Sequence, residues 1–89
     1  MNSRVTEDFV ALFAKLPTAV QKQARKSYRL WRTNPSHSGL HFKPIKGHDD
    51  VYSVRVSLGW RAVGLLEEGT INWFWIGSHS NYDKLLAHL

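Results

Sequence analysis

The chain has 89 residues, 43% of them hydrophobic, so we expect one folded domain spanning residues 1–89 rather than long disordered segments. It has no cysteine, which excludes disulfides and thiolate chemistry. No apolar run approaches the roughly 18 residues that span a bilayer. We therefore expect a cytoplasmic protein without a membrane partner. Twelve Lys and Arg against seven Asp and Glu give a formal charge of +5, which favours a polyanionic partner such as nucleic acid, the ribosome or an acidic protein.

Two helices are expected in the first third of the chain. Thr6-Glu7-Asp8 begins the first one, because acidic side chains are favoured at a helix N-terminus. Apolar residues at helical spacing follow until Pro17 ends the helix. Thr18 and Gln21 then form a capping-box pattern, which predicts a second helix running to about Thr33. The short connection predicts that the two helices form an antiparallel hairpin.

The second helix carries a stripe of cations along one side. Its members are Lys22, Arg25, Lys26, Arg29 and Arg32. Such a stripe is either a solvated helix face or a surface that meets phosphates or an acidic partner. From this stripe and the strand region that follows it, we take four residues as candidate nucleic-acid-binding residues: Arg25, Arg29, Lys43 and Lys46.

From His41 onward the pattern changes to the period of two that is typical of strands. The expected strands span His41–Ile45, Val51–Leu58, Arg61–Leu66 and Thr70–Ile76. Pro44 indicates that the first of these lies at a sheet edge or contains a break. Gly47–Asp50 is expected to form a turn. The last strand is apolar on both faces and is therefore expected to be central. A further strand at Ser3–Val5 is only weakly indicated.

The predicted fold is therefore of the α+β class. It consists of an N-terminal helical hairpin packed on a three- or four-stranded, twisted antiparallel sheet. Residues from Asn81 to the C-terminus are expected to form a short tail or helix.

Four residues of the strand region are candidates for chemistry: Arg55, Arg61, His79 and Tyr82. A two-residue turn at Leu58-Gly59 would put the two arginines on opposite faces of the sheet, whereas a three-residue loop would bring them to one face. The pattern leaves this choice open. If the last strand is central, His79 emerges beside the strands that carry both arginines.

These side chains suit RNA cleavage by the 2′-hydroxyl group. That reaction needs a base for the hydroxyl, cations for the phosphate charge and an acid for the leaving oxygen. Histidine can serve as base or acid near neutral pH, and arginine stays charged. Tyr82 could stack a base or orient the phosphate. We expect no metal site, since His37 and His41 are separated by Gly39 and no other ligand pattern occurs.

Three segments resemble the RelE/ParE toxin superfamily: Val51–Val56, Gly59–Val63 and Trp73–Asp83. The leading pair of helices ending in Asn34-Pro35 fits as well, so the resemblance covers nearly the whole chain. Its most specific parts are Trp60-Arg61 and Gly77–Ser80. The resemblance implies a RelE-like fold and the toxin of a type II toxin–antitoxin system, held inactive by a cognate antitoxin, as a monomer or dimer within that complex.

The resemblance also implies residue roles. Arg55 matches a basic strand position of the RelE-like active site, and Arg61 matches its phosphate-binding arginine. His79 matches the position after the last strand where relatives carry Arg or His. Tyr82 matches a terminal tyrosine of these relatives. The chain departs from RelE itself at Ser53, where RelE has a lysine that is the candidate base. Either His79 takes that role, with His48 as the second choice, or the chain is not a nuclease of this type.

The expected function is that of a metal-independent mRNA endoribonuclease that acts in the ribosomal A site, inhibits translation and needs no cofactor. Its expected partners are the antitoxin, the ribosome and mRNA. Two alternatives follow from the same resemblance. The chain could be a ParE-like toxin that inhibits DNA gyrase, or a non-catalytic member that only binds an antitoxin.

Overall fold

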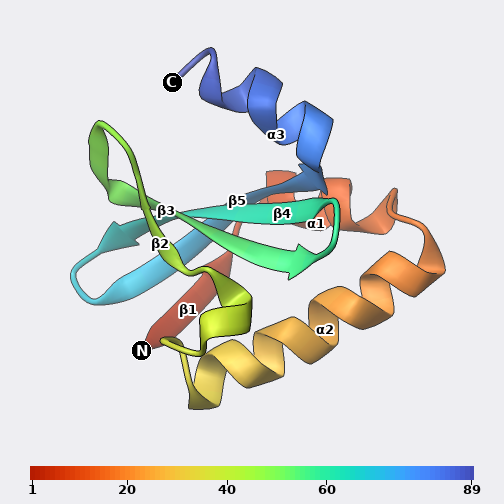
Figure 1. Ribbon diagram of the computed structural model, residues 1–89, viewed down its shortest axis with the longest axis horizontal. Coiled ribbons are helices and arrows are strands. Elements are labelled where there is room, and N and C mark those ends of the chain that lie inside the picture. The colour runs from red at the N-terminus through yellow and green to blue at the C-terminus, as the bar shows by residue number, and fades with distance from the viewer.

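A computed structural model describes all residues 1–89 as one five-stranded sheet with helices on both sides (Figure 1). In chain order the elements are β1 (Asn2–Val5), α1 (Glu7–Ala14), α2 (Thr18–Thr33), a 3-10 helix η1 (Ser38–Leu40), β2 (Lys43–Ile45), β3 (His48–Ser57), β4 (Trp60–Glu67), β5 (Thr70–Ser78) and α3 (His79–Leu86). The predicted α+β class is confirmed. The sheet has a fifth strand because the weakly indicated N-terminal strand does form.

The strands lie in the order β1-β5-β4-β3-β2. All neighbours are antiparallel except β1, which runs parallel to β5 along the edge. β5 therefore lies inside the sheet, as its apolar sequence predicts. The other edge strand, β2, contains Pro44, and its register with β3 shifts between Pro44 and Ile45. Both the edge position and the break expected from this proline are confirmed.

The two N-terminal helices begin in different ways. Thr6 caps α1 as predicted, since its hydroxyl accepts a hydrogen bond of 3.1 Å from the main-chain N–H three residues later. The capping box predicted at Thr18 is wrong: Pro17 occupies the N-cap position and α2 has no side-chain cap. The amide of Gln21 instead donates to the carbonyl of Phe13, at 3.0 Å. Gln21 thus links α2 to the end of α1.

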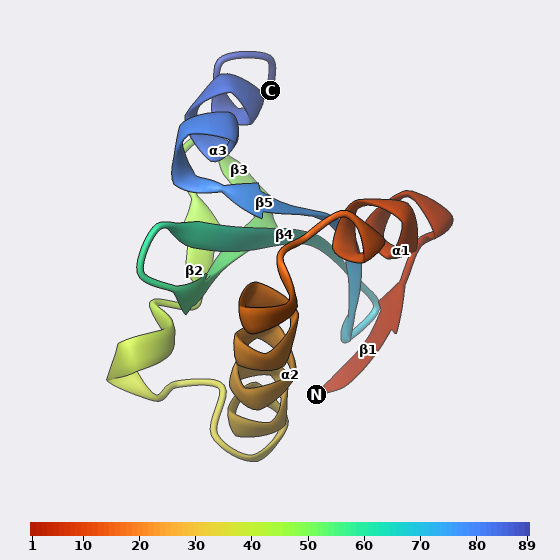
Figure 2. The same cartoon turned by 90° about the vertical axis from the view of Figure 1, so that its right-hand side faces the viewer.

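Both N-terminal helices pack on one face of the sheet, α1 against β5 and α2 against β3. The buried core lies beneath them and comprises Trp31, Leu40, Val54, Val56, Ala62, Ile71, Trp73 and Ile76. Trp31 of α2 and Trp73 of β5 meet edge to face, with ring centroids 5.4 Å apart. Helix α3 lies on the other side of the sheet from α2 in both views (Figures 1 and 2). No helix has the length and apolarity that a membrane span requires.

Two expected boundaries move in the structure. The turn predicted at Gly47–Asp50 is shorter, because β3 already begins at His48; Gly47 takes the positive φ of 85° that this tight turn needs. The C-terminal helix begins at His79 rather than near Asn81. Ser78 explains this early start, because its hydroxyl caps the helix by accepting from the main-chain N–H of Asn81 at 3.2 Å.

Candidate functional site

Arg55 and Arg61 lie directly opposite each other on β3 and β4. The turn between the strands is the two-residue type, since Ser57 pairs with Trp60, and by itself it would separate the arginines. A register shift between Arg55 and Ser57 adds Val56 to β3 as an extra residue. The bulge therefore brings both arginines to one face of the sheet, a result that the sequence left open.

This arginine pair has no carboxylate partner. The one close contact between a carboxylate and a basic side chain joins His79 and Asp83. The guanidinium of Arg61 is fixed through Nη1, which donates to the carbonyls of Ser57 at 3.3 Å and Trp60 at 3.0 Å. Like charges directly opposite each other destabilise a sheet, and these two arginines have no carboxylate to offset that cost, so both guanidinium groups are available to bind an anion.

His79 lies beside the same hairpin. It follows β5 directly, and its main-chain N–H donates to the carbonyl of Gly59 at 2.7 Å. On the side chain, Nδ1 lies 3.4 Å from Asp83 Oδ2, and the side chain is 49% exposed. A carboxylate beside one ring nitrogen orients the imidazole and leaves Nε2 for another partner. The His79 imidazole is thus exposed beside the β3–β4 turn.

Two aromatic rings extend the site from His79 across the sheet. The ring centroid of Tyr82 lies 5.8 Å from that of His79 and 6.2 Å from that of Trp75. The Trp75 indole covers Gly77, where an added Cβ would lie 2.8 Å from the ring. Gly77 in turn pairs with Arg61. Trp75 therefore belongs to this surface, although the sequence interpretation did not single it out; the alternation that puts Trp75 and Gly77 on one face was the available signal.

The lysines predicted in the strand region border a neighbouring cleft of about 240 Å³ between α3 and the β2–β3 hairpin. The cleft is lined by Lys43, Pro44, Ile45, Lys46, His48, Ser53, Tyr82 and Leu86. Tyr82 thus connects the cleft to His79. The hairpin arginines, the start of α3 and this cleft together make the candidate surface, and Arg55 also lines a pocket with Lys26 and Ser27 of α2.

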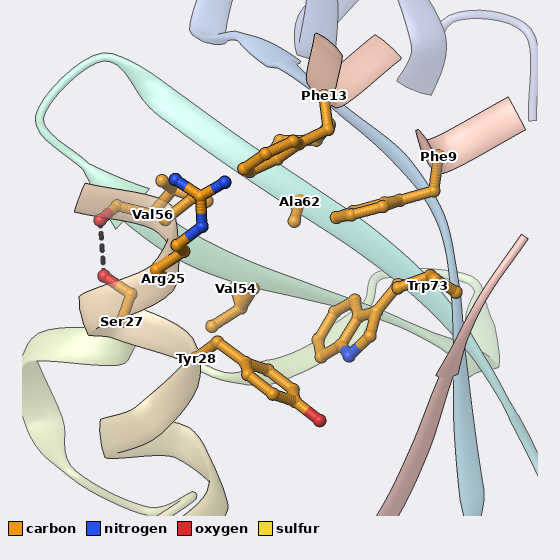
Figure 3. Close-up of a pocket in the computed structure, with 12 residues that line it drawn as sticks. Phe9, Phe13, Arg25, Ser27, Tyr28, Val54, Val56, Ala62 and Trp73 are labelled. Atoms are coloured by element: carbon orange, nitrogen blue, oxygen red, sulfur yellow. Dashed lines mark hydrogen bonds between the residues drawn. The ribbon is translucent and has the colours of Figure 1, made fainter. Parts of the chain in front are cut away.

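The structure does not bring the other two candidate residues to this surface. Arg25 and Arg29 are exposed on α2, across the sheet from α3 (Figure 1). The Arg25 guanidinium lies 5.0 Å from the centre of the Phe13 ring, at the border of an apolar pocket of about 180 Å³ between α1, α2 and the sheet (Figure 3). Their surface is separate from the one that contains His79.

Comparison with known proteins relates this architecture to toxins. Residues 18–84 match the family model of the ParE-like toxin domain. No curated protein matches the sequence.

Several solved structures share the fold. A chain of the RelB–RelE antitoxin–toxin complex from Methanococcus jannaschii is 20% identical with a TM-score of 0.73, over 91% of this chain and 96% of that one. The isolated RelE toxin of E. coli is 17% identical with a TM-score of 0.66, over 99% and 98%. YafQ from E. coli is 12% identical with a TM-score of 0.67, over 91% and 96%. At these identities the likeness concerns the fold alone.

Proposed function

This chain belongs to the ParE-like toxin domain family, within the RelE/ParE superfamily, and on that basis we propose that it is the toxin of a type II toxin–antitoxin system and an endoribonuclease that cuts mRNA in the ribosomal A site. The observation that carries the nuclease proposal is the pair Arg55 and Arg61, opposite each other and without a carboxylate. Two paired cations, of which Arg61 is held by hydrogen bonds, beside an accessible histidine match what phosphodiester cleavage requires.

In the proposed reaction the RNA supplies its own nucleophile. His79 accepts the proton of a 2′-hydroxyl, and the 2′-oxygen forms a bond to the adjacent phosphorus. The bond from phosphorus to the 5′-oxygen then breaks, and that oxygen takes a proton from water at this exposed site. The products are a 2′,3′-cyclic phosphate and a 5′-hydroxyl. The reaction consumes no cofactor, and we propose that it needs no metal ion.

The remaining side chains bind and orient the RNA in this proposal. Arg55 and Arg61 stabilise the negative charge that accumulates on the phosphate oxygens, because guanidinium groups remain charged and donate several hydrogen bonds. Tyr82 and Trp75 offer aromatic faces on which unpaired bases stack. The A site of the ribosome presents such an unstacked single strand, and the charge of +5 suits this environment.

We propose a cognate antitoxin as the second partner. A chain of the RelB–RelE antitoxin–toxin complex of Methanococcus jannaschii shares the fold, which supports this partner. The toxin is then held as a monomer or dimer within the complex.

Inhibition of DNA gyrase is the second candidate function, because the matching family model is described as ParE-like. In that case the chain is a binding protein, and the arginine pair contacts an acidic surface instead of RNA.

Induced expression in a bacterial host separates the two functions. The nuclease proposal predicts translation arrest and new mRNA 5′ ends within codons, without a DNA damage response. His79→Ala and Arg61→Ala should relieve the arrest, whereas Lys15→Ala, on the α1 side of the molecule, should remain toxic. DNA damage signalling with intact mRNA would instead support gyrase inhibition. A fully toxic His79→Ala variant would show that the catalytic assignment is wrong.

A further inference from the structure

The cleft between α3 and the β2–β3 hairpin has a buried polar floor. Ser53 lies there at 7% exposure, within a stretch of β3 that is otherwise apolar where it is buried. None of the side-chain hydrogen bonds of the chain involves its hydroxyl. The hydroxyl is not among the buried polar atoms that lack a partner, which are the indole nitrogens of Trp31 and Trp73, so it opens into the cleft. The Ser53 hydroxyl is therefore free to form a hydrogen bond with a molecule that enters this cleft.

The charges around the cleft indicate what kind of ligand this is. Lys43 pairs directly with Ser53 across β2 and β3, so both side chains lie on the same face of the sheet. Lys46 and His48 complete the basic lining, and no Asp or Glu lines the cleft. A hydroxyl donor on the floor and an ammonium group beside it suit an anion with several oxygens, such as a phosphate.

The position of the cleft relates it to the arginine pair. Ser53 and Arg55 are two residues apart on β3 and project from the same face, which corresponds to about 6.8 Å along the strand. That separation is comparable with the distance between neighbouring phosphates of a single strand. Tyr82 lines the cleft, and its ring centroid lies 5.8 Å from that of His79, which follows the strand beside the arginine-bearing hairpin. One strand of RNA can therefore contact both.

We infer that this cleft is a second phosphate-binding subsite, in which Lys43 and Ser53 hold the backbone phosphate next to the one bound by Arg55 and Arg61. The inference rests on the proposed RNA substrate and defines how the strand lies on the protein: from the β3–β4 turn, past Tyr82, to the β2–β3 hairpin. Lys46 contributes a further positive charge to the lining of the subsite, and His48 lies beside it.

The salt dependence of binding tests this subsite. The probe is a single-stranded 2′-O-methyl RNA, which lacks the nucleophile and stays intact. For single strands, the logarithm of the binding constant falls with the logarithm of salt concentration by about 0.7 for each phosphate contacted. Lys43→Ala should lower this slope by about 0.7, and Lys43→Ala combined with Arg61→Ala by about 1.4, because each variant removes a different phosphate contact. Lys15→Ala is the matched control for loss of one positive charge.

Ser53→Ala provides a variant without a change of charge. It should weaken the affinity several-fold and leave the slope unchanged, because it removes a hydrogen bond and no cation. Equal slopes for Lys43→Ala and Lys15→Ala, or no measurable binding by the wild type at low salt, would overturn the subsite. If the chain cleaves mRNA but Lys43→Ala has the same salt-dependence slope as Lys15→Ala, the proposed subsite is wrong and the nuclease proposal is supported. If Lys43→Ala lowers the slope but mRNA stays intact, the subsite is supported and the nuclease proposal is wrong.

Discussion

Arg55 and Arg61 share one face of the sheet because Val56 is an additional residue in β3. The carbonyl of Val56 accepts a hydrogen bond of 2.6 Å from the hydroxyl of Ser27, which lies on α2. The helix on one side of the sheet thus holds the bulge that sets the positions of the two arginines. This links the packing of α2 to the geometry of the candidate site.

Ser27→Ala tests this link. Loss of the hydrogen bond to Val56 should lower the free energy of unfolding by about 1 kcal/mol, measured by urea denaturation. It should also reduce RNA binding, because the bulge loses its support. The matched control is Thr6→Ala, which removes the cap of α1 at a similar cost of about 1 kcal/mol, away from the arginines. Equal RNA binding by the two variants would show that Ser27 has a structural role only.

Removing one arginine of the pair should separate stability from function. Arg55→Gln ends the repulsion between like charges across β3 and β4, so the free energy of unfolding should stay unchanged or rise by up to about 1 kcal/mol. RNA cleavage should fall at the same time, as is common when a charge kept for function is removed. The comparison variant is Arg29→Gln on α2, expected within about 0.5 kcal/mol of the wild type. Marked destabilisation by Arg55→Gln in urea would show that the arginine contributes to folding instead.

Gly77→Ala should displace Trp75. The new Cβ would lie 2.8 Å from the indole, and such overpacking costs about 1–3 kcal/mol. Because the clash is with one side chain, the cost should largely vanish in a Trp75→Leu background. A double-mutant cycle on thermal unfolding measures this coupling. Additive effects of the two substitutions would mean that Gly77 is required for another reason.

The sequence was sufficient for the parts of the fold that depend on local pattern. Alternation located the strands, and the apolar run of β5 predicted its internal position. The sequence was not sufficient for the parts of the fold that depend on tertiary contacts. The carbonyl of Val56 at the bulge is hydrogen-bonded by Ser27, 29 residues away, and the hairpin sequence alone carries no signal for this contact or for the bulge that pairs the two arginines.

The parts of the candidate site that the sequence did not predict also depend largely on tertiary contacts. The pairing of Lys43 with Ser53 follows from the break at Pro44, whose register no local pattern specifies. Ser78 is a local signal for the early start of α3, because a serine directly before a helix is a typical N-cap. The sequence analysis does not use this signal, because it expects only a short tail or helix from Asn81. Arg25 and Arg29 were grouped with the strand lysines by charge alone, and charge does not say which side of the sheet a residue occupies.

Cleavage by the purified chain on ribosomes paused with a defined codon in the A site tests the central claim most directly. The wild type should cut the mRNA within that codon and leave a 2′,3′-cyclic phosphate, and Arg61→Ala, if it unfolds like the wild type in urea, should cut at least a hundredfold more slowly, since loss of one charge-stabilising donor costs about 10²–10³ in rate. Intact mRNA with folded wild-type protein, or full-rate cleavage by Arg61→Ala, would contradict the account.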